Sequence, residues 1–567
     1  MLQIASGKLF SRPSRRENLL RGMLYTNGTL ARDGNIETAA GRLLPSSSYS
    51  IHPKCIVYEF TEHIEDEEHG PGVLISSGVE PYLQDYSVVV SFALNCVCTP
   101  DVDLARRLTT GQRGLVTRVA PQTLVHNFFD EQVICKPDDL QFLKNFVEKL
   151  IALQRHTFLG VMRALRTYIN GMHRIADDLE LAYTLLVASV ESLAQEFDGH
   201  ESNWESLDEH KRKAIDEALS GADEMIAQRV RGALLSVEHV ALSRRFREFV
   251  LSHMTSGYFR NTPDFKGPKL GRSDLPEVLG KAYQSRSKYI HQLLQLPDMV
   301  TMGHEYSETA IAGRSTFLTL QGLSRLMRHT IIEFVMNQPS VANEPYNYHL
   351  ERSGVVKVRL APQYWVGRAE GDITEAGRDK LEGFLEQLAP CLLKEKNAVL
   401  TDIRPVLTTA TAFIPHLNKR LRLPYLALFA LFNMHVPAKD SFATPAVVEK
   451  LIQDELGEPS SEALISYALS GNVIPWSLEV HRTALRTYLR RRTTKNGLRF
   501  PRLFEAAITL ELAERLRCNG EVEDSREFVS LAVENYPGHS GLLQFEEKFQ
   551  TSISINWRDV MMPPKQE

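Results

Sequence analysis

DDLQFLKNFVEKLIALQRHTFLGVMRALRTYINGMHRI, residues 138–175, is the stretch of this chain whose pattern most clearly specifies its fold. Apolar residues recur in it at steps of three and four, from Leu140 to Met172. That spacing is the period of an amphipathic α-helix with one face against a core. The sequence therefore predicts a long helix here, with Gly160 as the place where it could break.

Helical patterns continue on the C-terminal side of this stretch. Asp177-Asp178 is typical of a helix start, because an aspartate side chain caps the first backbone N–H groups. Further helices are predicted over Leu179–Phe197, Glu209–Ser220, Glu224–Ser252, Leu275–Leu296 and Leu318–Met336. Residues 337–345 contain two prolines and end the region. We expect residues 136–345 to form one helical bundle.

The regions on either side differ in pattern. Before residue 136, short β-branched runs bounded by turn residues predict strands at Cys55–Phe60, Gly72–Ile75 and Ser87–Leu94. After a short strand-like run at Gly354–Leu360, residues 375–549 again show helical periodicity. The predicted fold is mainly α. It has a β-rich domain at 1–135, the helical bundle at 136–345 and an α-helical, solenoid-like domain at 346–567.

The composition bounds the class of protein. A chain of 567 residues is long enough for about three to five domains. Lys and Arg number 65 and Asp and Glu number 70, so nucleic-acid binding would need a local basic patch rather than overall charge. The six cysteines show no C-x-x-C spacing, which argues against a disulfide scaffold and against a zinc ribbon.

Several other classes are excluded by missing patterns. No stretch approaches the ~18 apolar residues of a membrane span, and the apolar opening before Lys8 is too short for a signal peptide. We therefore expect a cytoplasmic protein without a membrane partner. The chain has no phosphate-binding Gly-Lys-Ser/Thr loop and no G-x-S-x-G motif, and we expect neither a cofactor nor a metal site.

The segment that carries candidate chemistry is YQSRSKYIH, residues 283–291. In a helix His291 lies one turn from Ser287, whereas Arg286 lies roughly 140° around the axis from His291. An arginine fork can hold the oxygens of a phosphodiester, and a histidine can move a proton near neutral pH. Together these residues suit phosphodiester cleavage, with Arg286, Ser287 and His291 as candidate catalytic residues.

An Arg/His spacing of this kind also arises by chance, as any short motif does. Two other pairs occur, Arg166/His173 and Arg247/His253. The first lies inside the long amphipathic helix and is interrupted by Gly171. The second lies at a helix end, on a face that we expect to be solvated. The residues around each pair therefore have to indicate which of the three Arg/His pairs could form a site.

The residues around Arg286 and His291 resemble the HEPN superfamily, in particular its Apea-like branch. Tyr-x-x-Arg-Ser-x-x-Ile-His at 283–291 is similar to the family's Arg-(x4–6)-His signature. The run Ala182–Leu193, with Glu191 ahead of a leucine, resembles the family's earlier helix, and Leu323–Val335 resembles the helix after the motif. The likeness covers about residues 178–336. Ser287 replaces the commoner Asn, and Gln292 replaces a small residue.

The resemblance implies a metal-independent endoribonuclease, such as a bacterial antiphage defence or toxin effector. Two protomers would pair so that two Arg/His sets line one cleft. The RNA 2′-hydroxyl would attack the adjacent phosphorus, with His291 as general acid or base, Arg286 stabilising the phosphate and Ser287 positioning either group. Tyr283 and Glu191 would support the site.

A structural role for the same residues is the alternative. Arg286 could pair with a carboxylate such as Glu191, and His291 could be a bonded, partly buried histidine. The chain would then be a non-catalytic HEPN protein. It would dimerise through the bundle and bind RNA or, through its C-terminal helices, a protein partner.

A second feature is the basic run RTALRTYLRRRTTKNGLRFPR at 482–502, which contains no acidic residue. Arg486, Arg490, Arg491 and Lys495 are candidates for binding an RNA backbone. The interleaved Tyr488 and Phe500 could stack on bases. A solvated helix face is the plainer interpretation of such a run.

Overall fold

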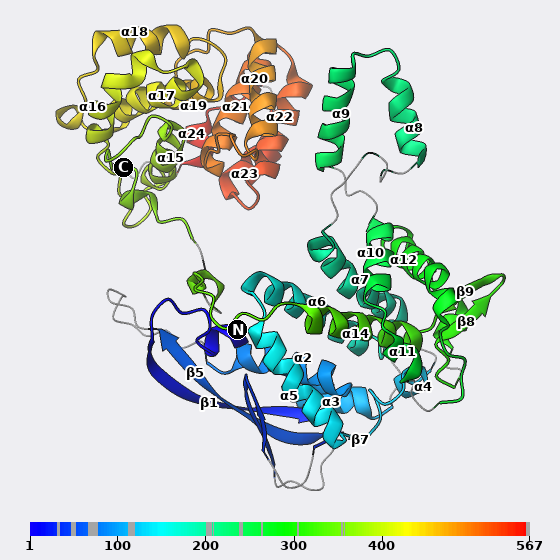
Figure 1. Cartoon of the computed structure of the whole chain (residues 1–567). Helices are drawn as coiled ribbons and strands as arrows, with labels where there is room; N and C mark the ends of the chain where they lie inside the picture. The colour runs from blue at the N-terminus through cyan, green and yellow to red at the C-terminus, as the bar shows by residue number, and fades with distance from the viewer. Residues whose placement is uncertain are drawn as a thin grey trace. The chain divides into compact units, whose positions relative to one another are not determined.

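The computed structural model of the chain describes residues 1–30, 35–46, 53–65, 78–111, 119–199, 204, 207, 209–237, 242–261, 265–302, 305–352, 355–356, 358–550 and 552–562. The chain divides into two compact units, Met1–Lys357 and Val358–Glu567 (Figure 1). Each unit has a hydrophobic core of its own, and we describe them separately.

The first unit begins with a five-stranded sheet in the order β3-β4-β5-β1-β6. Its strands are β1 (Ser14–Thr26), β3 (Ile36–Thr38), β4 (Gly41–Pro45), β5 (Lys54–Glu65) and β6 (Cys98–Thr99). β1 and β5 pair antiparallel along their length, with Leu20 opposite Phe60. The predicted strand at Cys55–Phe60 is confirmed as part of β5. The predicted strand at Gly72–Ile75 lies outside the described residues.

The prediction of a strand at Ser87–Leu94 is wrong, because these residues end the helix α2 (Glu80–Leu94). Pro81 lies in the first turn, where it needs no N–H partner. The helix is buried on both sides. Tyr86 stacks on Tyr58 of the sheet at 4.1 Å between ring centroids, and Phe92 meets Tyr168 of the bundle at 5.2 Å. A helix buried all round has no polar face, so its valine run looks like a buried strand.

The helices of the bundle follow α2. Those that pack on one another are α5 (Pro137–Ala152), α6 (Arg155–Arg174), α7 (Leu179–Phe197), α10 (Leu242–Ser252), α12 (Leu275–Gln292) and α14 (Leu320–Asn337). The predicted long helix is therefore two helices, which break at Leu153-Gln154 rather than at Gly160. Gly160 lies within α6, where a Cβ atom would come within 2.6 Å of the Phe197 ring. A close approach of α7 explains this glycine better than a helix break.

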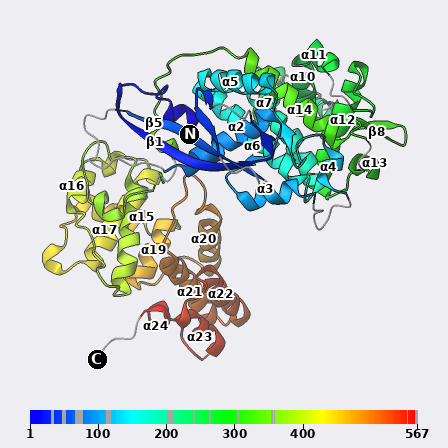
Figure 2. The same cartoon turned by 90° about the horizontal axis from the view of Figure 1, so that it is seen from below.

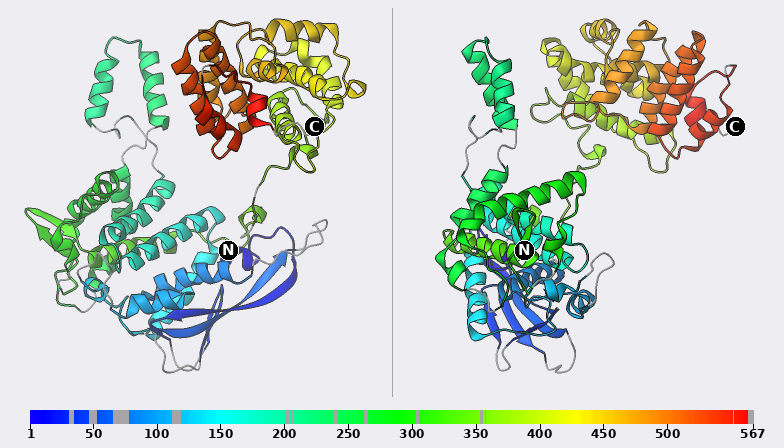
Figure 3. Two further views of the ribbon diagram at one scale, coloured as in Figure 1. Left: turned by 180° about the vertical axis from the view of Figure 1, so that it is seen from behind. Right: turned by 90° about the vertical axis from the view of Figure 1, so that its right-hand side faces the viewer.

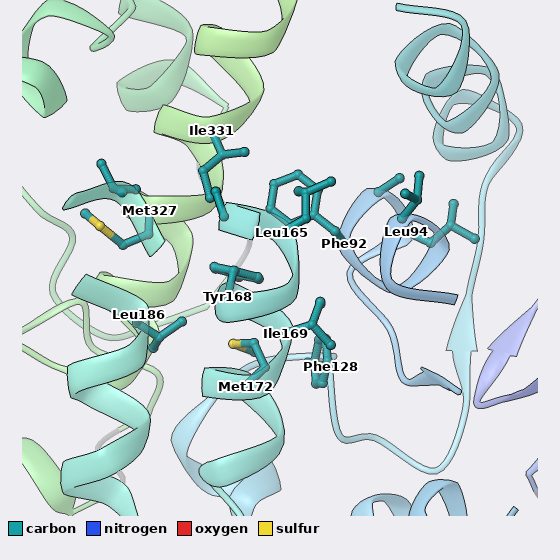
Figure 4. Close-up of a cluster of buried hydrophobic side chains, with 14 of the residues drawn as sticks. Phe92, Leu94, Phe128, Leu165, Tyr168, Ile169, Met172, Leu186, Met327 and Ile331 are labelled. Carbon is teal, nitrogen blue, oxygen red and sulfur yellow. The ribbon is translucent and has the colours of Figure 1, made fainter. Parts of the chain in front are cut away.

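One core joins the sheet region and the bundle. Buried side chains of α2, α6, α7 and α14 pack together, as Figure 4 shows for Phe92, Tyr168, Leu186 and Met327. The predicted domain limit at 135/136 is therefore not a limit between separate cores. The remaining elements of the unit are α1 (Leu2–Ala5), α3 (Val102–Thr109), α4 (Pro121–Leu124), α8 (Glu209–Ala218), α9 (Glu224–Val237), α11 (Ser256–Arg260), α13 (Asp298–Thr301), β2 (Gly28–Thr29), β7 (Val133–Ile134), β8 (Thr309–Ala312) and β9 (Ser315–Leu318).

The predicted strand at Gly354–Leu360 does not form in the residues described there. Val356, Val358 and Leu360 are 75%, 72% and 64% exposed and belong to no strand. A β-branched run needs a partner strand to pair with, and none of the described residues pairs with this segment.

The second unit is helical, as predicted (Figures 2 and 3). Its helices are α15 (Gly377–Leu392), α16 (Arg404–Phe413), α17 (Lys419–His435), α18 (Ala446–Glu455), α19 (Ser461–Ser470), α20 (Leu478–Arg491), α21 (Arg502–Cys518), α22 (Val522–Asn535), α23 (Ser540–Lys548) and α24 (Trp557–Met561). α17 and α21 contribute the most side chains to this core. A solenoid stays a prediction. Across the described residues, no helix combines the length and the apolar composition needed to cross a membrane.

Candidate functional site

The Arg286/His291 segment occupies the last two turns of α12. The helix begins with Pro276 in its first turn and buries Val278, Leu279 and Ala282 against the bundle. It packs against α7 and α10 (Figure 1). It ends at Leu293, whose φ of 54° is left-handed and whose N–H donates to the carbonyl of Tyr289. The buried first half fixes the helix, and the second half presents polar side chains at the surface.

Arg286 is held by a buried carboxylate from α7. Its Nη2 lies 2.8 Å from Oε2 of Glu191, and the two side chains are 21% and 5% exposed. The hydroxyl of Tyr283 donates to Oε1 of the same carboxylate at 3.0 Å. The neighbouring α7 residues Leu186 and Val190 are fully buried, which fixes the backbone that carries Glu191. The association of Arg286 with Glu191 is the contact that the structural alternative expected.

The electrostatics of this cluster keep the Tyr283 hydroxyl protonated. Burial, and then the Glu191 carboxylate, raise the pKa of Tyr283 to about 12. Tyr283 is therefore protonated near neutral pH and remains a donor. The guanidinium of Arg286 also lies 5.6 Å from the centroid of the Tyr283 ring. Its Nε is buried and finds no acceptor among the described residues. These contacts hold the side chain in one orientation.

His291 is different, because it is exposed in the last turn of α12. Within the described parts of the chain, the side chains of His291 and of the half-buried Ser287 have no hydrogen bond or ion pair. Nor does any interaction join Arg286 directly to His291 there. The helix end itself is fixed by the hydroxyl of Tyr289, which lies 3.4 Å from a carboxylate oxygen of Asp178. The expectation that both Arg286 and His291 face a solvated cleft therefore fits His291 better than Arg286.

Five exposed apolar side chains lie within a short stretch of sequence at and after the end of α12 and were not anticipated from the sequence. We call Ile290, Leu293, Leu294, Met299 and Met302 the α12-end patch; they are 45%, 74%, 50%, 41% and 44% exposed. Single exposed apolar residues are ordinary, but a group of them is typical of an interaction surface. The signal in the sequence is the run Ile290-His-Gln-Leu-Leu294 at the end of a helix whose buried face is already complete.

In the two other Arg/His pairs the histidine is half-buried. Arg166 pairs with Asp85 at 2.5 Å. The partial burial of His173 lowers its pKa to about 4, so it stays neutral. Nδ1 of His253 lies 2.8 Å from the carbonyl oxygen of Phe249 in its own helix. Neither histidine has the open position of His291.

In the second unit, the predicted RNA-binding residues are accessible. Arg486, Arg490 and Arg491 on α20, and Lys495 after it, are exposed, and their side chains have no ion pair with a described residue. The prediction that Tyr488 and Phe500 stack on bases is wrong. These rings are 1% and 3% exposed and stack on each other at 4.6 Å.

No family model, no curated protein and no solved structure matches the chain. Among the described residues, no group of three or more His, Cys, Asp or Glu side chains is arranged to hold a metal ion.

Proposed function

We propose that the chain is a metal-independent endoribonuclease of the HEPN type. The observation that carries the proposal is the end of α12, where an exposed histidine, with no side-chain partner among the described residues, follows an arginine that a buried carboxylate orients. An exposed imidazole can exchange protons with a substrate, and a fixed guanidinium can hold a phosphate without reorganising. Function as a bacterial defence or toxin effector in the cytoplasm belongs to the same proposal.

Each residue has a distinct part in this mechanism. His291 removes the proton from the RNA 2′-hydroxyl or protonates the leaving 5′-oxygen. Arg286 uses Nη1, the nitrogen that is neither paired with Glu191 nor buried, to stabilise the negative charge on the phosphorane. Ser287, one turn before His291, orients the imidazole or the phosphate. Glu191 and Tyr283 position Arg286 and do not touch the substrate.

The test is cleavage of RNA by the purified full chain in the presence of EDTA. Because the proposed chemistry uses only side chains, cleavage should continue at an unchanged rate after chelation. Loss of cleavage on chelation, with recovery after adding Mg²⁺ or Mn²⁺, would contradict a metal-independent mechanism.

A homodimer follows from the same proposal, and the α12-end patch supports it. Arg286 and His291 lie about 140° apart on one helix, so two copies can complement each other's sets. Covering the patch would also remove apolar surface from water beside His291. RNA would bind in addition along Arg486, Arg490, Arg491 and Lys495 of the second unit.

Leu293→Asp combined with Leu294→Asp should therefore convert the protein into monomers and abolish most cleavage. Two carboxylates in an apolar interface cost desolvation energy and repel their symmetry mates. Both positions are exposed, and aspartate tolerates the left-handed backbone of Leu293, so the fold should survive. Light scattering should show the mass fall from twice 64.1 kDa to 64.1 kDa.

Val473→Asp is the matched control, since Val473 is an 87% exposed apolar residue of the second unit. It should leave the mass and the cleavage rate unchanged. A wild-type protein that is monomeric at micromolar concentration and still cleaves RNA would contradict the shared cleft.

The second candidate function is a non-catalytic interaction protein. The ion pair between Arg286 and the buried Glu191 favours it, because this contact alone explains the arginine. In that case the purified chain would not cleave RNA under any of these conditions, and His291→Ala would behave as the wild type in binding assays.

A further inference from the structure

The second unit contains a cavity of ≈ 970 Å³. One wall is α15 together with Glu395, which follows it. The other wall is the segment Arg492–Leu503, which connects α20 to α21. Tyr536, at the end of α22, also lines it. All of these residues belong to one unit, and the volume lies within the range of small-molecule sites.

Most of the charges in the cavity neutralise each other. Arg359 lies 3.8 Å from Glu382, and Arg378 lies 3.2 Å from Asp379. Arg492 forms an ion pair with Glu505, which is buried. A main-chain N–H of the connecting segment, at Arg499, donates to Glu382 at 2.8 Å and ties the two walls together. These pairs build the frame of the cavity.

Three cations of the connecting wall are left over. Lys495, Arg499 and Arg502 line the cavity and are exposed. No described residue gives their side chains a hydrogen bond or an ion pair. Arg502 is also the first residue of α21, and the first intrahelical donors of that helix are Phe504 and Glu505. Arg502 and Leu503, whose N–H groups have no acceptor within the helix, therefore line the same wall as the three cations, which suits a phosphate.

The opposite wall carries the complementary chemistry. Glu386 and Glu395 line it, and their carboxylates have no partner among the described residues. Carboxylates repel a phosphate but accept hydrogen bonds from hydroxyl and amino groups. The phosphate of a ligand would therefore lie against the segment 495–502. Its hydroxyl-bearing part would lie against α15.

We propose that this cavity is a binding site for a nucleotide, with the phosphate on Lys495, Arg499 and Arg502 and the ribose hydroxyls toward Glu386 and Glu395. The nucleotide is either a free one or the phosphorylated end of an RNA strand, since both present the same groups. Arg499, Arg502 and the two glutamates lie outside the proposed RNA-binding residues on α20. The site also does not depend on cleavage at α12.

The test is a binding titration of the full chain carrying His291→Ala, so that cleavage cannot interfere. The probes are AMP, inorganic phosphate and a 5′-phosphorylated RNA decamer, and calorimetry measures the binding of each. Arg499→Ala and Arg502→Ala should each weaken AMP binding roughly tenfold or more, as expected for the loss of a charge-assisted hydrogen bond. Both residues are exposed, so the melting temperature should stay the same.

Arg420→Ala and Lys450→Ala are the matched controls, because both cations are exposed, have no side-chain partner among the described residues and do not line the cavity. They should leave the binding of AMP and of the decamer unchanged. If AMP does not bind but the 5′-phosphorylated decamer does and is weakened by the cavity variants but not by these controls, the ligand is an RNA end. If neither probe binds, or if Arg420→Ala and Lys450→Ala weaken binding as much as Arg499→Ala, the proposal is overturned.

The hydroxyl-binding wall has its own readout. Glu386→Gln combined with Glu395→Gln should weaken AMP binding and tighten or preserve the binding of inorganic phosphate, which carries no ribose. An equal effect on both probes would overturn the assignment of the two walls. Because every measurement uses the cleavage-deficient chain, failure of this site and failure of the nuclease proposal remain distinguishable.

Discussion

His291→Ala is expected to lower the rate of RNA cleavage by roughly 10²–10⁴-fold, the usual range for the loss of a general acid or base. The imidazole is exposed and makes no hydrogen bond or ion pair with the residues that the structure describes. Removing it therefore should not change the melting temperature or the oligomeric mass. Single-turnover cleavage of a labelled RNA, with binding measured separately, gives the rate of the chemical step.

His253→Ala is the control for this prediction. Its ring is bonded to its own helix, and the pair Arg247/His253 has the same type of spacing. It should cleave RNA at the wild-type rate. If His253→Ala is the inactive variant, or if His291→Ala cleaves normally, the site has been assigned to the wrong helix end.

Arg286→Ala is expected to reduce both cleavage and stability, because the guanidinium pairs with the buried carboxylate of Glu191 and is also proposed to hold the phosphate of the RNA. Loss of the guanidinium leaves the carboxylate of Glu191, 5% exposed, with Tyr283 as its only remaining partner in the described structure. An uncompensated buried charge of this kind costs about 3 kcal/mol in the free energy of unfolding. Cleavage should fall by a factor comparable to that of His291→Ala. Urea denaturation and single-turnover cleavage measure the two effects.

A double variant separates these effects. Arg286→Ala combined with Glu191→Gln removes the buried charge while keeping an acceptor for Tyr283, so stability should largely return. Cleavage should stay lost, because no guanidinium is left to hold the phosphate. Recovery of cleavage together with stability would show that Arg286 has only a structural role. Arg286→Lys should recover part of both, since lysine keeps the charge and loses the fork.

Helical periodicity identified most of the bundle, and it failed where burial removes the polar face. The period of residues 138–175 and 275–296 appears in the structure as α5, α6 and α12. The run Ser87–Leu94 looked like a strand because α2 lies between the sheet and the bundle, with apolar neighbours on both sides. A buried strand and a helix that is buried on both sides each show continuous apolar residues, so no local pattern distinguishes them.

The candidate site, too, could be predicted from the sequence only in part. The motif residues and Glu191 could be selected from the sequence, because helical spacing and the resemblance indicate which residues share an element. The sequence could not decide whether Glu191 holds Arg286, because that contact depends on how α7 packs against α12. The sequence also could not show that Tyr488 and Phe500 stack on each other and not on bases, because that contact depends on the fold of the segment between α20 and α21.

The most direct test of the nuclease proposal is the chemistry of the new RNA ends. A defined RNA is cleaved by the wild-type chain in EDTA, with His291→Ala in parallel, and the fragments are analysed by mass spectrometry. Attack by the 2′-hydroxyl predicts 2′,3′-cyclic phosphate ends and new 5′-hydroxyl ends from the wild type, and almost none from His291→Ala. Fragments with 3′-hydroxyl and 5′-phosphate ends, or the same fragments from both proteins, would contradict the proposed mechanism.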